Sequence, residues 1–159
     1  MSRLTLKLKA APTERVDLGG LLPGLVAGKS NGDIERIAVG TSGSGLTIGD
    51  LFTVSGSAGD KIVIASGSDR LDSVGAGLTA GSIEVEGDIG AYGGAGMTGG
   101  HLLVSGNAGP LLGAAMKNGL VHVKGSAGEL AGGARPTDRY GMLGGIIVVY
   151  GDVGERSGY

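Results

Sequence analysis

The sequence has no cysteine and no tryptophan, and its 159 residues include a single phenylalanine. The lack of cysteine excludes disulfide bonds, thiolate metal sites and cysteine nucleophiles. Aromatic residues make up only 3% of the chain, so a core must be built from Val, Ile, Leu and Ala. No run of five or more Lys or Arg residues occurs and the formal net charge is −2. Nucleic acids and anionic membranes are therefore not expected as partners.

The first residues also lack the features of a signal peptide, because charged side chains interrupt their apolar pattern. No apolar run approaches the ~18 residues that a membrane span needs. A cytoplasmic location is the resulting expectation.

Glycine is what the chain has in excess, with 36 residues against a usual share of roughly 7%. There is no three-residue glycine period, which excludes collagen, and 41% hydrophobic residues make disorder a poor interpretation. Instead the glycines punctuate a repeat. Four strand-like segments of alternating character each end in Gly-x-x-Gly: 82–87, 101–106, 120–125 and 146–151.

The repeat has a period of 19 residues, measured from Gly87 to Gly106 and again from Gly106 to Gly125. The next step, to Gly151, is 26 residues, which is one period plus seven inserted residues. A fixed period near 20 in an apolar, glycine-punctuated chain indicates a solenoid. We therefore predict an all-β fold, a parallel β-helix whose coils turn at the Gly-x-x-Gly motifs.

Two parts are predicted: an irregular N-terminal cap over residues 1–60 and the β-helix over residues 61–159. The C-terminal residues fall within a turn of the repeat, so we expect the β-helix to be truncated in mid-coil. Within the cap, the expected elements are a strand at 3–9, a capped helical turn at 30–33, and strands at 47–48 and 51–55.

Alignment of the four segments sorts their side chains into columns. Two columns are purely apolar and share one face, so they are expected to form the interior. They are Ile83/Leu102/Val121/Ile147 and Val85/Val104/Val123/Val149. A third column, Leu78/Met97/Met116/Met142, precedes the strands and is expected to fill the core.

The opposite face changes character along the repeat. Its first segment carries Glu84 and Glu86, whereas its last segment is wholly apolar or aromatic. An outward face of that kind is not expected of a lone soluble protein. We therefore predict that a partner subunit, or further chain, covers the later segments. The predicted interface residues on these segments are Leu120, Ile146, Val148 and Tyr150.

Three features of the sequence resemble parts of catalytic or ligand-binding sites. Gly94–Gly99 fits G-x-G-x-x-G, but a dinucleotide site needs a strand before it and a helix after it, and here a strand follows. His101 and His122 lack the third and fourth ligands of a zinc site. The acids at 84–88 suggest a sugar-acting enzyme, since glycoside hydrolases need two carboxyls that flank the scissile bond. The equivalent positions of the next repeat are Leu103, Ser105 and Asn107, however, so no acidic cluster builds across the repeats. We predict no catalytic, cofactor-binding or metal-binding residue on this chain.

The seven-residue insertion is the one departure from the repeat. Loops on a rigid scaffold often carry function. Arg135 and Arg139 in this stretch are suited to hold a carboxylate-bearing ligand or an acid of a neighbouring subunit. A solvated surface loop is the alternative interpretation.

Several stretches carry a family resemblance beyond the glycine repeat. They are Leu8–Arg15, Gly49–Gly56, Val74–Leu78, Gly106–Ala115 and Gly151–Arg156. Together they resemble the C subunit of formylmethanofuran dehydrogenase, and especially its bacterial form, the C subunit of the formyltransferase/hydrolase complex of methylotrophs. The C-terminal GXGXG domain of the glutamate synthase large subunit is similar in repeat and stays open as an alternative.

The resemblance implies a right-handed β-helix subunit with a structural role and no catalytic residues. It implies three partners: a metal-dependent amidohydrolase-like subunit, a dehydrogenase-like subunit and a formyltransferase. The metals and a methanofuran- or methylofuran-type carrier are expected on those partners. In the bacterial complex a formyl group passes from formyl-tetrahydromethanopterin to the carrier and leaves as formate. In methanogens the related enzyme fixes CO2 on methanofuran.

Overall fold

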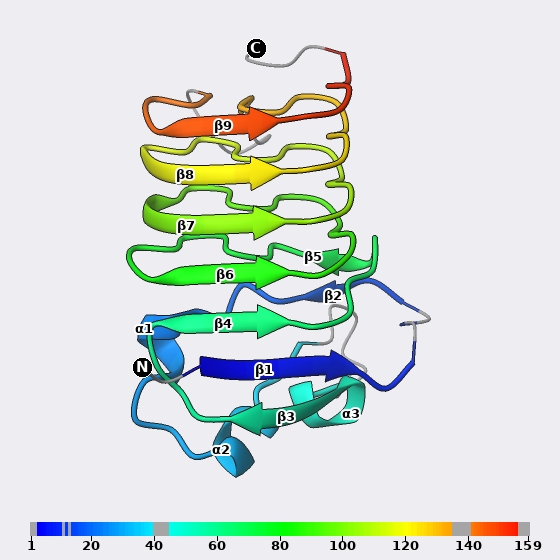
Figure 1. Ribbon diagram of the computed structural model, residues 1–159, viewed down its shortest axis with the longest axis vertical. Helices are drawn as coiled ribbons and strands as arrows, with labels where there is room; N and C mark the ends of the chain where they lie inside the picture. The colour runs from blue at the N-terminus through cyan, green and yellow to red at the C-terminus, as the bar shows by residue number, and fades with distance from the viewer. Residues whose placement is uncertain (1–2, 11, 13, 40–44, 135–140, 156–159) are drawn as a thin grey trace.

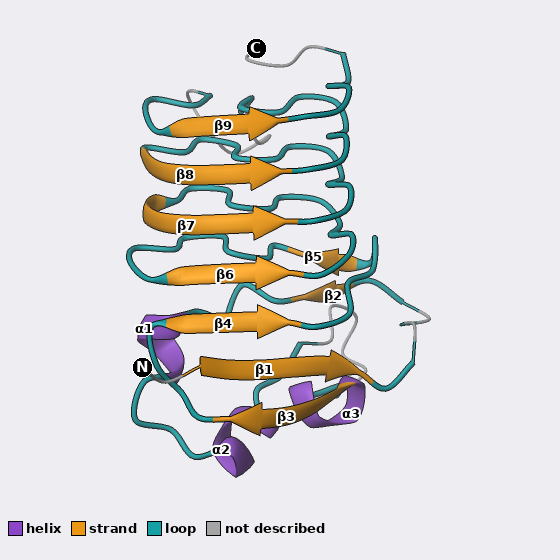
Figure 2. Ribbon diagram, viewed as in Figure 1, coloured by secondary structure: helices purple, strands orange, loops and turns teal. Residues whose placement is uncertain are grey.

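The computed structural model describes residues 3–10, 12, 14–39, 45–134 and 141–155 (Figure 1). This part of the chain is mostly strand and turn, with three helices of one turn or slightly more (Figure 2). The elements are β1 (Arg3–Leu8), β2 (Val16–Asp17), α1 (Pro23–Val26), α2 (Asn31–Glu35), α3 (Ile48–Leu51), β3 (Phe52–Gly56), β4 (Lys61–Ile64), β5 (Leu71–Asp72), β6 (Ser82–Val85), β7 (Thr98–Val104), β8 (Asn118–Val123) and β9 (Ile146–Val149).

One mixed sheet organises the molecule. It has seven strands in the order β3-β1-β4-β6-β7-β8-β9. Neighbours from β1 to β9 pair in parallel, and only β3 runs antiparallel to its neighbour β1. Figure 1 shows these strands stacked one above another, with β9 nearest the C-terminus. The short strands β2 and β5 form a separate parallel pair.

The predicted right-handed parallel β-helix is wrong. Regular pairing in the described residues is confined to the mixed seven-stranded sheet and the β2–β5 pair, so the further parallel sheets of a β-helix are missing. The physical reason lies in the segments that return from one strand to the next. Glycines and left-handed residues interrupt their extended backbone, so these segments form turns and isolated bridges instead of strands.

The N-terminal expectations are partly confirmed. The strand at 3–9 is β1, and α2 begins as expected, with the Ser30 hydroxyl accepting a hydrogen bond from the Asp33 backbone N–H at 3.2 Å. The strand expected at 47–48 is wrong, because that segment opens α3. There the Asp50 carboxylate accepts a bond from the Thr47 backbone N–H at 2.9 Å, as in a capping box. The division at residue 60 stays a prediction.

The register of the parallel strands confirms the two apolar columns. Ile83 pairs with Leu102, Leu102 with Val121, and Val121 with Ile147. The column members on β6, β7 and β8 are buried, whereas Ile147 and its neighbour Val149 are only partly buried, because β9 is the last strand of the sheet. In the third column, Leu78, Met97 and Met116 are buried and Met142 packs against them.

The return turns stack as closely as the strands do. Ser73, Tyr92, Leu111 and Leu130 recur every 19 residues and all have φ near +60°. Each donates its backbone N–H to a carbonyl of the following repeat, at distances of 2.8–3.0 Å. These contacts offset the cost of a left-handed backbone at residues with a side chain, which is about 1–3 kcal/mol.

A side-chain ladder fastens the repeats at the ends of the strands. The Asp88 carboxylate accepts the Asn107 backbone N–H at 2.8 Å, and the Asn107 side chain accepts the Ser126 N–H at 2.9 Å. The Ser126 hydroxyl then accepts the Asp152 N–H at 3.0 Å. Each side chain thus satisfies a backbone donor that would otherwise lie unpaired between repeats.

An ion pair joins the N-terminal region to the repeats. The Arg15 guanidinium makes a fork with Asp72, with contacts of 2.8 and 2.7 Å. The hydrogen bond to Asp72 raises the pKa of Arg15, against the lowering effect of desolvation. The same Asp72 carboxylate accepts the backbone N–H of Ala91 at 2.8 Å, so it holds the next repeat as well.

The close stacking predicts which glycines cannot change. A Cβ on Gly109 would lie 2.7 Å from the carbonyl carbon of Gly90, whereas a Cβ on Gly24 in α1 would meet nothing within 4 Å. We expect Gly109→Ala to lower the free energy of unfolding by about 1–3 kcal/mol. Gly24→Ala is the matched control and should be neutral or slightly stabilising. Urea unfolding measures both, and equal effects would contradict the close approach.

Candidate interaction surface

The seven-stranded sheet has a buried face and an outer face. The outer face carries acidic, basic and apolar side chains in neighbouring positions. We use "outer face" for the side chains of β4 and β6–β9, with the residues that follow them, that point away from the core. The in-register pairing arranges these side chains in rows that cross the strands. One row is Val63, Glu84, Leu103, His122 and Val148, and the next is Glu86, Ser105, Lys124 and Tyr150.

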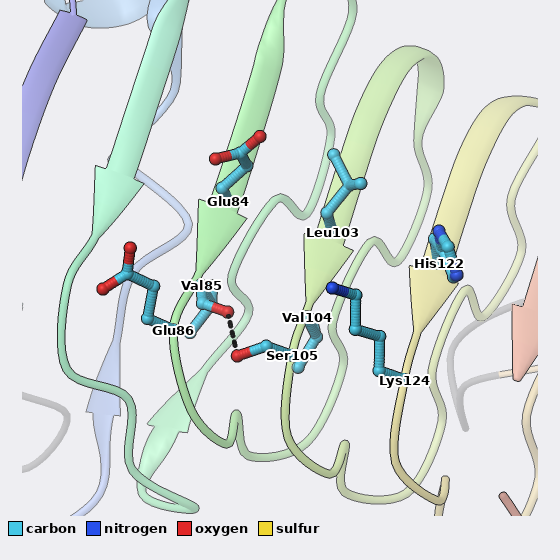
Figure 3. Close-up of a pocket in the computed structure, with 8 residues that line it drawn as sticks. All are labelled: Glu84, Val85, Glu86, Leu103, Val104, Ser105, His122 and Lys124. Carbon is cyan, nitrogen blue, oxygen red and sulfur yellow. Dashed lines mark hydrogen bonds between the residues drawn. The ribbon is translucent and has the colours of Figure 1, made fainter. Parts of the chain in front are cut away.

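A hollow of about 250 Å³ lies in the middle of the outer face. Figure 3 shows the side chains around it. Glu84, Leu103 and His122 lie on β6, β7 and β8, and Glu86, Ser105 and Lys124 directly follow the ends of these strands. The Ser105 hydroxyl accepts the Gly87 N–H at 2.9 Å and donates to the Val85 carbonyl at 3.1 Å, so it belongs to the stack. The hollow therefore has an apolar floor between walls of opposite charge.

His122 is the polar group of this surface that the fold leaves unsatisfied. Its Nε2 atom is buried and makes no hydrogen bond within the described structure. Its ring meets the Tyr150 ring edge to face, with centroids 4.8 Å apart. Such a contact is favourable for aromatic rings, but the buried nitrogen without a partner lowers stability.

The predicted interface residues lie at the β8–β9 end of the outer face. Ile146 is 61% exposed and Tyr150 is 68% exposed. Leu120 and Val148 are partly covered. Their place on one face is thus as the sequence indicated, and their contact with another subunit stays a prediction. Arg135 and Arg139, the other predicted interface residues, lie outside the described residues.

The structure assembles no catalytic group from the other candidates. Glu84 pairs with Lys61 at 3.1 Å, and Asp88 is engaged in the ladder. His101 and His122 lie on adjacent strands but in different rows. Across the described ranges, no three His, Cys, Asp or Glu side chains are close enough to hold a metal ion. The Gly94–Gly99 motif begins in a turn and its last two residues open β7, so a strand follows the turn as the sequence predicted.

Two features that shape the surface, the hollow and the ladder, were not predicted from the sequence. The hollow depends on side chains from three strands, so no single segment signals it. The ladder residues do have a signal, because each follows the first glycine of a Gly-x-x-Gly motif and has a short side chain that accepts hydrogen bonds. None of the helices in the described part of the chain is long and apolar enough to cross a membrane.

The repeat, the in-register sheet and the graded outer face define a class of glycine-rich, repeat-built β protein. No family model matches the chain. The solved structure of the formyltransferase/hydrolase complex FhcABCD from Methylorubrum extorquens, in complex with methylofuran, contains a chain of the same fold. That chain superposes with a TM-score of 0.94 at 43% identity, over 97% of this chain and 58% of its own length.

Curated relatives agree with this structural match. Over 86 residues the chain is 49% identical to the C subunit of the formyltransferase/hydrolase complex Fhc of Methylorubrum extorquens, an alignment that covers 54% of this chain and 32% of the relative. Over 97 residues it is 35% identical to the C subunit of the tungsten-containing formylmethanofuran dehydrogenase 2 of Methanothermobacter thermautotrophicus, covering 58% and 36% of the two chains.

The resemblance predicted from the sequence is confirmed: the chain is a homologue of the C subunits of formyltransferase/hydrolase and formylmethanofuran dehydrogenase complexes. The alignments span about a third of the length of the curated relatives, and 58% of the solved chain.

The unsatisfied His122 nitrogen predicts the effect of its replacement. His122→Phe keeps a ring against Tyr150 and removes the orphaned Nε2, so we expect the free energy of unfolding to rise by about 1 kcal/mol. His101→Phe, at an exposed position on the neighbouring strand, is the matched control and should change it by less than about 0.5 kcal/mol. Urea titrations give both values. A destabilised His122→Phe would show that the nitrogen has a partner.

Proposed function

We propose that this chain is a non-catalytic structural subunit of a formyltransferase/hydrolase or formylmethanofuran dehydrogenase-type complex in one-carbon metabolism. The observation that carries the proposal is the likeness to the chain of the FhcABCD complex over 97% of this chain. The relatives are C subunits, which does not favour the glutamate synthase alternative.

The chemistry of such a complex would then reside on the partner subunits. These are an amidohydrolase-like subunit with metals, a dehydrogenase-like subunit and a formyltransferase. They would move a formyl group from formyl-tetrahydromethanopterin to a methanofuran- or methylofuran-type carrier and release it as formate. The name FhcABCD, which marks four kinds of subunit in the solved relative, and the methylofuran bound to that complex are consistent with this division of labour. A cytoplasmic location belongs to the same proposal.

The surface that another subunit would cover is the β8–β9 end of the outer face. Ile146 and Tyr150 offer two large, exposed side chains there, and Leu120 and Val148 extend the apolar area between them. Apolar and aromatic side chains that lose their water in this way supply most of the binding energy of protein interfaces. The role of this patch is assembly rather than catalysis.

Assembly can be tested with a tagged chain purified from its own cells. We expect the other subunits of a formyltransferase/hydrolase complex to co-purify in a constant ratio, and the assembled fraction, but not the isolated chain, to release formate. Ile146→Asp should reduce recovery of the chain in that assembly by at least about tenfold, because it places a carboxylate in an apolar contact. Leu25→Asp, at an equally exposed apolar position on α1, is the control.

If the tagged chain co-purified with a glutamate synthase partner instead, the proposed function would be wrong. If Ile146→Asp assembled as well as the unaltered chain, the proposed function would still stand, but the β8–β9 end of the outer face would not be the interface.

A further inference from the structure

The charges of the outer face are arranged symmetrically about β7. Glu84 lies on β6 and Glu86 directly after it, on one side of Leu103, whereas Lys124 lies directly after β8, on the other side, beside the imidazole of His122 (Figure 3). The two flanks are two strand spacings apart, or about 9.6 Å. Because the pairing is in register, Glu86 and Lys124 occupy the same row, and so do Glu84 and His122.

This arrangement is self-complementary. A twofold axis that lies along β7, between two outer faces, places β6 of one copy opposite β8 of the other and keeps the position along the strands. Glu86 then meets the second copy's Lys124, and the same contact occurs twice, as in an isologous interface. Glu84 comes to the same row as the second copy's His122, and Leu103 meets its own equivalent. An axis across the strands would instead oppose acid to acid, which is unfavourable.

We propose that two copies of this chain associate through their outer faces, about a twofold axis along β7. The inference rests on the proposed function in one respect only. The proposed function requires a subunit that covers the β8–β9 end of the outer face, and the inference identifies that subunit as a second copy of this chain. Glu86 and Lys124 are both exposed, and neither is paired with an opposite charge within the described structure. Glu84 is already paired with Lys61 at 3.1 Å, so the Glu86–Lys124 contacts carry the specificity.

The apolar groups fit the same arrangement. Two Leu103 side chains would fill the hollows of about 250 Å³ that face one another at the axis. The β9 end of each copy would lie opposite β4 of the other, where Val148 comes to the row of the buried Val63 and Ile146 to the row of Lys61. The exposed Ile146 and Tyr150 would then be covered at both edges of the interface, where they would add apolar burial to the charge contacts.

The test is a charge exchange followed by the mass of the chain in solution. We expect the purified chain to run at twice its 15.5 kDa in light scattering, with weaker association at high salt. Glu86→Lys and Lys124→Glu each place like charges opposite one another twice, so each should raise the dimer dissociation constant at least about tenfold. Glu129→Lys and Lys117→Glu, exposed positions outside the sheet, are controls with the same charge changes.

Two combinations of these variants distinguish binding of a second copy of the chain from binding of a different protein. The double variant Glu86→Lys/Lys124→Glu restores both contacts and should regain the dimer, and an equal mixture of the two single variants should form a mixed dimer. Binding of a different protein to this face would not be regained by the exchange.

A chain that stays at 15.5 kDa at every concentration overturns the proposal, as does a dimer that neither single variant weakens. Failure of the double variant to recover overturns it too. Circular dichroism melts of each variant exclude unfolding as the cause. Co-purification with the other subunits would still test the proposed function, whatever the outcome here.

Discussion

The close approach of one repeat to the next is the constraint on which this structure depends. At the turns, backbone meets backbone with no room for a side chain, as Gly109 against Gly90 shows. That distance allows the return segments to hydrogen-bond from repeat to repeat, and it brings the strands into one register. The close approach of neighbouring repeats is therefore the physical reason for the abundance of glycine.

The outer face follows from the same constraint. Apart from one shift in register between Thr98 and His101, the strands β6–β9 pair residue for residue, so equivalent residues form straight rows. A change in residue type along the repeat then becomes a gradient across the surface. Here the gradient runs from the acids of β6 through Leu103 to the basic groups of β8 and the apolar end at β9. The uniform interior and the graded exterior are therefore two results of one repeat, in which packing restrains the buried columns and leaves the outer ones free.

The sequence predicts the columns well, because alternation and a fixed period report directly on which side chains share a face. It does not predict the return segments, since Tyr92 and Leu111 take a left-handed backbone that their side chains do not favour and only the stacking imposes. This is why the β-helix prediction was wrong. The strand expected at 47–48 was wrong because the Asp50 carboxylate caps a helix there. Of the candidate surface, the apolar end was predictable, whereas the hollow requires three strands to be placed together.

The side-chain ladder has a consequence for how such a chain tolerates change in length. The step from Ser126 to Asp152 is 26 residues instead of 19, and the ladder still closes at 3.0 Å. The ladder hydrogen bonds thus depend on the positions of the strand ends and not on the number of residues that connect one strand to the next. New segments can be added between strands without disturbing their neighbours, so loops can diverge in evolution, or be grafted by design, while the wall that carries them stays unchanged.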